Sequence, residues 1–170
     1  MGQFGIGQPV AREEDPYLLR GKGRYVDDVS ERAQLQASVL RSPFAHAKIN
    51  SIDISAAESA PGVHLVLTGD HPEVAKLGLQ HPMVQRYRRD GTPVPPCPQK
   101  HLATDVVRYV GDYVAFVVAD TLAQAKDAAE MIVVDYEELP SVVSTSAAVT
   151  PAAPQIWEEL PNNEMYVHRV

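Results

Sequence analysis

The clearest pattern of apolar and polar positions lies in residues 104–140, where it predicts a strand, a turn, a strand, a helix and a strand in succession. Residues 106–110 are mostly β-branched or aromatic, and Gly111-Asp112 after them is a two-residue connector typical of a hairpin, because glycine accepts the positive φ of such turns. Residues 113–119 are apolar at every position, which favours a strand covered on both faces. The pattern therefore predicts a hairpin with a deeply buried second strand.

The helix in this stretch is predicted to begin after Thr121. Thr121 and Gln124 have the spacing of a capping box, in which side chains satisfy the free backbone N–H groups of the first turn. Helical spacing places four apolar residues on one face: Leu122, Ala125, Ala129 and Ile132. A strand follows at 133–136 and ends before Pro140, which cannot donate to a β-ladder. We expect the helix to pack on the sheet and to leave Phe116, in the middle of the apolar strand, buried.

The first half of the chain repeats this alternation of strands and short helices. Strands are predicted at 33–41, 47–54 and 63–67. Ser55 is expected to cap a short helix, and Thr68 or Asp70 to open a helical turn. Roughly six strands and two or three helices then form two layers, which is an α/β (α+β) fold with helices packed on a mixed sheet.

Proline content marks two segments that differ from the rest. The span 78–101 carries prolines that remove backbone donors and fix φ, so we expect an irregular loop: Pro82, Pro93, Pro95, Pro96 and Pro98. Residues after 144 are rich in Ser, Thr, Ala and Pro, which favours an extended connector with a short turn near 146–149. The expected organisation is one domain at 1–144 and a connector at 145–170.

Composition narrows the function classes. A chain of 170 residues suits one core of ordinary size, and its formal net charge of −7 disfavours a nucleic-acid partner. The basic cluster Arg86, Arg88 and Arg89 is followed by Asp90, which is typical of a solvated loop. The single cysteine, Cys97, excludes an internal disulfide and an iron–sulfur cluster. We expect a cytoplasmic protein without a membrane span, because the sequence shows neither a long apolar run nor a secretion signal.

Two groups of residues resemble ligand-binding motifs, and both favour a plainer interpretation. Glycines near the N-terminus lack the spacing of a phosphate-binding loop and read as turn residues: Gly2, Gly5, Gly7, Gly21 and Gly23. Cys97, His81 and His101 are conceivable metal ligands. They lack a fourth partner and the usual ligand spacing, so a loop thiol and two surface imidazoles are favoured.

The remaining candidates are a histidine and two acidic pairs. His46 stands between two alanines, and a structural hydrogen bond is favoured over a role in a site. Neighbouring carboxylates on a strand point to opposite faces, so Asp27-Asp28 and Glu137-Glu138 do not form catalytic pairs. On this basis no catalytic, cofactor-binding or metal-binding residue is assigned to this chain.

Four motifs in order carry a family resemblance. They are RGKGRYVDDV at 20–29, RSPFAHAKINSIDIS at 41–55, PGVHLVLTGD at 61–70 and the 104–140 stretch with its RYVGDYVAFVVAD. From about residue 12 to residue 163 the chain resembles the start of the molybdopterin-binding large subunit of the molybdenum hydroxylases. These include xanthine dehydrogenase, aldehyde oxidase and aerobic carbon monoxide dehydrogenase, and the last is the branch to which the motifs look most similar.

The resemblance implies an α/β-hammerhead domain, with the catalytic base and the residues that hold the molybdenum pyranopterin further along the subunit. This chain is then the non-catalytic N-terminal domain of an enzyme that hydroxylates a carbon centre of an aldehyde or N-heterocycle, or oxidises carbon monoxide. The connector 145–170 would lead toward the molybdopterin-binding domains. Electrons would pass to iron–sulfur clusters and FAD on partner subunits or domains. The alternative is a stand-alone hammerhead protein that serves binding or assembly and has no enzymatic activity.

Overall fold

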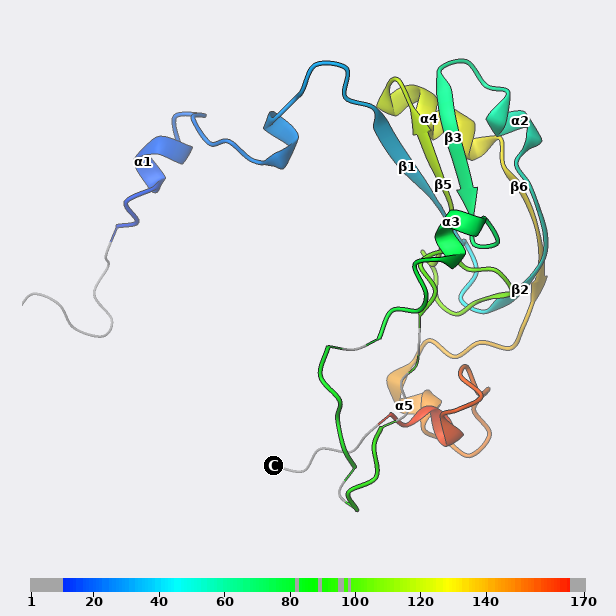
Figure 1. Cartoon of the computed structure of the whole chain (residues 1–170). Helices are drawn as coiled ribbons and strands as arrows, with labels where there is room; N and C mark the ends of the chain where they lie inside the picture. The colour runs from blue at the N-terminus through cyan, green and yellow to red at the C-terminus, as the bar shows by residue number, and fades with distance from the viewer. Residues whose placement is uncertain (1–10, 82, 89, 95–96, 98, 166–170) are drawn as a thin grey trace, which may run out of the picture. The chain divides into compact units, whose positions relative to one another are not determined.

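The computed structural model describes residues 11–165 apart from 82, 89, 95–96 and 98, and it is drawn in Figure 1. Contacts divide the chain into two compact units, Met1–Gln34 and Leu35–Val170. The first unit contains the short helix α1 (Asp15–Leu18) and the 3-10 turn η1 (Val26–Asp28). None of its described residues, 11–34, is buried, so these residues form no apolar core of their own.

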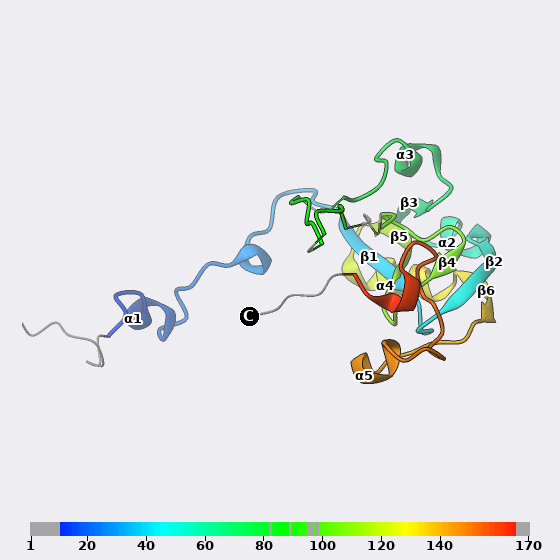
Figure 2. The same cartoon turned by 90° about the horizontal axis from the view of Figure 1, so that it is seen from below.

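The second unit is built on two three-stranded sheets (Figures 1 and 2). One sheet has the order β1-β5-β3, with the strands Gln36–Arg41, Tyr113–Ala119 and Val63–Thr68. The other has the order β4-β2-β6, with the strands Val106–Val107, Ala47–Asp53 and Val133–Glu138. Every described pair of these strands is antiparallel, so two antiparallel sheets stand where one mixed sheet was expected. The α/β character and the positions of the strands are confirmed.

The hairpin predicted at Gly111-Asp112 does not form, because β4 and β5 belong to different sheets. Gly111 and Asp112 instead bond to Ser42: the Ser42 N–H donates to the Asp112 carbonyl and the Gly111 N–H donates to the Ser42 carbonyl, both at 2.8 Å. The Asp112 carboxylate also accepts from the backbone N–H of Arg108 at 3.1 Å. Gly111 does take a positive φ, 94°, so the conformation of this glycine was predicted correctly, whereas the pairing of the two strands beside it was not.

Helix α4 (Leu122–Glu130) packs on the sheet of β1 and β5. It begins as predicted, since the Thr121 hydroxyl accepts from the Gln124 N–H at 3.3 Å and donates to the Gln124 side-chain oxygen at 2.8 Å. Its buried positions are alanines: Ala125, Ala128 and Ala129. Leu122 was expected among them but is 44% exposed, because it lies about 70° around the helix from the centre of the buried face.

The shorter helices begin one or two residues away from the predicted caps. Helix α2 (Ser55–Glu58) starts after Ile54, and the Asp53 carboxylate accepts from both the N–H and the hydroxyl of Ser55, at 3.0 and 2.7 Å. Ser55 is therefore a donor inside the turn and not its cap. Helix α3 (Pro72–Ala75) starts after His71, whose Nδ1 accepts from the Glu73 N–H at 3.2 Å.

Two apolar clusters form the core of the second unit. The first joins β5, β3, α2 and α4: Ala57, Val66, Ala115, Val117, Ala128, Ala129 and Ile132. The second joins the β4-β2-β6 sheet to the start of β5: Ala47, Ile49, Ala103, Val107 and Val114. Ile52 and Val134 pack against both clusters.

Phe116 was predicted to be buried, and this prediction is wrong. Ala115 and Val117 are buried against α4, whereas Phe116 between them is only half-buried. Successive side chains of a strand point to opposite faces, so Phe116 faces away from α4. The apolar run of β5 correctly indicated burial of the face toward α4 and of Val114 in the second cluster, but not of Phe116.

The loop and the tail are more structured than expected. Within 78–101, isolated antiparallel bridges join Gln80 to Gln99 and Tyr87 to Pro93, and Val94 is buried. The other loop prolines and Arg89 lie outside the described residues. In the tail, the predicted turn is present as α5 (Thr145–Ala148), and a second turn, η2 (Pro161–Asn163), follows buried Leu160. No helix in the described part of the chain has the length and apolar character to cross a membrane.

Candidate functional site

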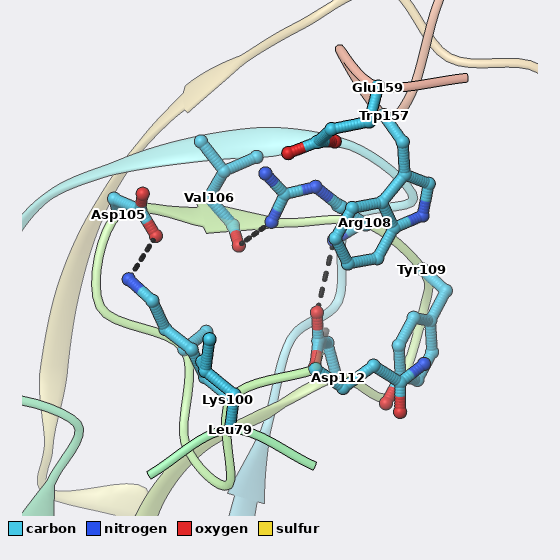
Figure 3. Close-up of a pocket in the computed structure, with 11 residues that line it drawn as sticks. Leu79, Lys100, Asp105, Val106, Arg108, Tyr109, Asp112, Trp157 and Glu159 are labelled. Atoms are coloured by element: carbon cyan, nitrogen blue, oxygen red, sulfur yellow. Dashed lines mark hydrogen bonds and ion pairs between the residues drawn. The ribbon is translucent and has the colours of Figure 1, made fainter. Parts of the chain in front are cut away.

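A cavity of about 180 Å³ lies beside β4 and the 108–112 loop (Figure 3). It is lined by side chains from the 79–112 region and by Trp157 and Glu159 of the tail. Charged residues are concentrated there: Lys100, Asp105, Arg108, Asp112 and Glu159. Its lining carries more charged side chains than two other cavities of the second unit, which are lined by residues 80–165 and 69–104.

Arg108 joins β4 to the tail. Its guanidinium lies 4.3 Å from the centre of the Trp157 ring, and its Nε donates to the Ile156 carbonyl at 3.3 Å. Figure 3 shows the two side chains stacked at the cavity wall. A planar guanidinium suits both contacts, because it can stack on an aromatic face while its edge donates hydrogen bonds. We call residues 144–163, which this contact ties to β4, the C-terminal clasp.

The Asn163 side chain links three other parts of the clasp by hydrogen bonds. Its side-chain oxygen accepts from the Ile156 N–H at 3.0 Å, and its Nδ2 donates to the carbonyls of Ala148 and Pro154 at 3.0 and 2.8 Å. Asn163 also takes a positive φ of 55°, a conformation that asparagine tolerates better than most residues. The clasp is therefore a defined turn structure with a single side chain at its centre.

Lys100 and Asp105 form an ion pair at the other end of the cavity. Lys100 Nζ lies 2.9 Å from the Asp105 carboxylate and also donates to the Thr104 hydroxyl. Partial burial works to raise the pKa of Asp105, but the hydrogen bond and charge of Lys100, together with hydrogen bonds from the Val106 N–H and the Thr104 hydroxyl, outweigh it and hold the pKa below its usual value. In the same cavity, burial and the nearby Asp112 carboxylate raise the pKa of Tyr109.

These shifts indicate what the cavity is suited to. The pKa of Asp105 moves down and that of Tyr109 moves up, so both groups move away from neutral pH. A general acid or base works best with a pKa near the working pH. The arrangement of paired charges and a stacked arginine is typical of structural anchoring, and we assign it that role.

The Asp105 ion pair predicts a pH-dependent stability difference. Because the folded-state pKa of Asp105 is depressed, its stabilising contribution is present above the unfolded value of about 4 and is lost as the pH falls through the folded pKa. The Asp105→Asn variant should therefore have a lower urea midpoint than the parent protein at pH 7. The loss in free energy of unfolding should be less than about 1 kcal/mol, since the ion pair is largely exposed. The difference should disappear at about pH 2. A difference that is unchanged at low pH would contradict this assignment.

Arg108 gives a second prediction. Arg108→Lys keeps the charge but loses the planar stack on Trp157 and the Nε hydrogen bond, so we expect a loss of about 1 to 2 kcal/mol, confined to the clasp. Hydrogen exchange should rise in residues 144–163 and stay unchanged in β5. Arg41→Lys is a matched control, because Arg41 also stacks on an aromatic ring, that of Tyr113 at 4.4 Å, but does not touch the clasp. Equal exchange in the clasp for both variants would refute the role of Arg108.

The suspected metal ligands do not come together. Cys97 and His81 line one cavity, of about 320 Å³, whereas His101 lines another and shares a 3.0 Å hydrogen bond with Gln80. Burial, followed by the nearby charge of Glu159, raises the pKa of Cys97, which disfavours the thiolate that binds metals. Within the described ranges, no group of three His, Cys, Asp or Glu residues is placed to hold a metal ion.

The other sequence candidates have local structural contacts. His46 is buried, and its Nδ1 lies 2.8 Å from the Pro140 carbonyl, which is the structural bond that the sequence favoured. Asp28 accepts from the Tyr25 N–H at 2.9 Å, and Glu137 lies 4.0 Å from Lys48 on the surface. Gly21 takes a positive φ, as a turn glycine does. Gly2, Gly5 and Gly7 lie outside the described residues.

Sequence comparison identifies the family. Residues 20–140 match the family described as "Aldehyde oxidase and xanthine dehydrogenase, a/b hammerhead domain". Because this match covers most of the chain, the chain belongs to that family, and the resemblance of its four motifs is confirmed. The hammerhead fold is confirmed as well.

Individual relatives support the assignment. The chain is 40% identical over 158 residues to the nicotine 6-hydroxylase large subunit of Paenarthrobacter nicotinovorans, covering 93% of this chain and 18% of the relative. It is 37% identical to the carbon monoxide dehydrogenase large chain of Afipia carboxidovorans, covering 96% of this chain and 19% of the relative. The crystal structure of quinoline 2-oxidoreductase from Pseudomonas putida 86 superposes with a TM-score of 0.73 at 41% identity, over 92% of this chain and 19% of that one.

Two facts follow from these matches. The chain spans about a fifth of the length of the relatives it matches. Relatives named for nicotine and quinoline are at least as similar to it as carbon monoxide dehydrogenases are, so similarity does not single out the carbon monoxide branch.

Proposed function

We propose that this chain is the N-terminal hammerhead domain of a molybdenum hydroxylase large subunit and carries no catalytic residue itself. The observation that carries the proposal is the match of residues 20–140 to the hammerhead family, in relatives whose chains are about five times as long. The fold agrees, because the quinoline enzyme contains the same unit at a TM-score of 0.73. The role is to build and support the subunit, while the chemistry belongs to other domains.

The parent enzyme in this proposal hydroxylates a carbon centre of an N-heterocycle or an aldehyde, or oxidises carbon monoxide. The N-heterocycle is favoured, because the relatives named for nicotine and quinoline are 40% and 41% identical, against 34% and 37% for two carbon monoxide dehydrogenase large chains. The parent would bind the molybdenum pyranopterin, with iron–sulfur clusters and FAD on partner subunits or domains, in the cytoplasm. One solved relative is named a Cu,Mo enzyme.

In the proposal, the residues that hold the molybdenum pyranopterin belong to other domains of the subunit; among the described residues of this chain, no three His, Cys, Asp or Glu side chains lie together. In the proposal, residues 1–144 form the hammerhead domain and 145–170 lead toward the molybdopterin-binding domains. The clasp supports this, because Arg108 fixes the path of the chain as it leaves the β4-β2-β6 sheet.

The proposal is tested by the gene and by metal content. The open reading frame should continue for several hundred codons beyond Val170, and the encoded subunit, purified with its partners, should contain about one molybdenum per chain. The 170-residue chain alone should contain none in stoichiometric amount and should oxidise no aldehyde, purine or carbon monoxide. A stop codon directly after Val170 would favour a stand-alone binding or assembly protein. Stoichiometric molybdenum in the isolated chain would refute the non-catalytic role.

A further inference from the structure

Among the helices and strands of the described residues, only α4 and α2 pack extensively on the β1-β5-β3 sheet, and α4 leaves one of its faces open (Figure 1). Helix α4 covers the opposite face, where Ala115 and Val117 are buried in the first cluster. The strand register places two rows of side chains on the open face: Val39, Phe116 and Leu67 in one row, and Ala37, Val118 and Leu65 in the next. None of the six is buried; Ala37 and Leu65 are exposed and the other four are half-buried.

The chemistry of this open face is unlike that of a solvated surface. An antiparallel sheet with one face in water normally alternates between apolar and polar residues, whereas here the six positions of these two rows are all apolar, and the exposed pair Arg41 and Tyr113 bounds them at one end. β5 is apolar throughout, as a strand covered on both faces would be. Contiguous apolar patches of this kind mark a surface that another part of a protein covers.

We propose that the open face is the docking surface for the remainder of the large-subunit polypeptide, through an apolar surface of that remainder. This inference rests on the proposed function. The length of the relatives supports this occupant, because in the matched structures the same unit belongs to a chain of which it forms only 19%. The six residues carry no charge, and Arg41 at the end of the face already stacks on Tyr113 and donates to the Gly111 carbonyl, so the covering surface is apolar rather than a charged peptide or a nucleic acid.

Leucine-to-lysine substitutions test the surface with a matched control. Leu65 on the open face is 42% exposed, and Leu122 on α4, which lies outside that face, is 44% exposed. In the 170-residue chain, Leu65→Lys and Leu122→Lys should shift the urea midpoint equally little. In the full subunit, Leu65→Lys should lower the unfolding temperature by several degrees and reduce the yield of soluble subunit, and Leu122→Lys should do neither.

Each other outcome overturns the inference. If Leu65→Lys already destabilises the 170-residue chain more than Leu122→Lys, the face is covered within this chain. If sedimentation shows a dimer of the chain that Leu65→Lys dissociates, while the full subunit is unaffected, a second copy is the occupant. Equal effects of the two variants in the full subunit would show that the rest of the subunit does not cover the open face. A reading frame that ends at Val170 refutes the proposed function, whereas a longer frame that tolerates Leu65→Lys refutes only the docking surface.

Discussion

Val117→Asp is expected to unfold the second unit. Val117 is fully buried in the first cluster, between Val66 of β3 and the alanines of α4. An aspartate there would place an unpaired charge or a protonated carboxyl in apolar surroundings, at a cost of at least about 4 kcal/mol. A domain of this size has roughly 5 to 15 kcal/mol available. Circular dichroism and urea titration should show a protein that is largely unfolded or close to it at room temperature.

The neighbouring Val118 provides the control. It is the same residue type on the same strand, but it points to the open face and is only half-buried. Val118→Asp in the 170-residue chain should cost about 1 kcal/mol, because the carboxylate can reach water. Equal destabilisation by the two variants would mean that the facing of β5 has been misassigned, and the docking surface would fall with it.

Gly69→Ala has the second large expected effect. A Cβ at Gly69 would lie 2.5 Å from the Thr104 side chain, 2.7 Å from the Leu102 carbonyl oxygen and 3.0 Å from the Ala103 carbonyl oxygen. The Thr104 methyl can rotate, but the two backbone oxygens are fixed by the chain that leads to β4. We expect a cost of about 3 kcal/mol, at the upper end for overpacking.

Gly78→Ala separates this clash from ordinary glycine effects. A Cβ at Gly78 meets nothing within 4 Å, although Gly78 has a positive φ of 71°. That substitution should cost only the conformational strain, about 1 kcal/mol. Denaturation midpoints of the two variants decide between them, and a Gly78→Ala that is equally or more destabilising would show that the close approach at Gly69 is relieved easily.

Short-range signals predicted local structure well. The cap of α4 at Thr121 and the positive φ of Gly111 depend on residues within a few positions, and both are confirmed. The hairpin failed because the choice of strand partner depends on a distant residue, Ser42, which no local pattern reveals. The prediction that Phe116 is buried failed for a related reason, since the apolar sequence of a strand does not indicate which layers cover its two faces.

The candidate site was not predictable from the sequence. Arg108 stands in the RYVG motif, whereas its two partners, Ile156 and Trp157, stand in the polar tail. The partners follow Arg108 by 48 and 49 residues. Neither periodicity nor spacing links such distant positions. The one available signal was the single tryptophan of the chain, placed in a segment otherwise rich in small residues. A large aromatic residue in such a segment indicates a contact elsewhere.

Ile52 and Val134 have a consequence for how the two sheets come apart. They are direct cross-strand partners in β2 and β6, and both also pack against the cluster under α4. Opening either sheet therefore removes packing contacts from the other, so these two residues couple the unfolding of the two sheets. The central strands β2 and β5 should exchange their amide hydrogens at one common, global rate, even though the described strands form two separate sheets with no ladder between them.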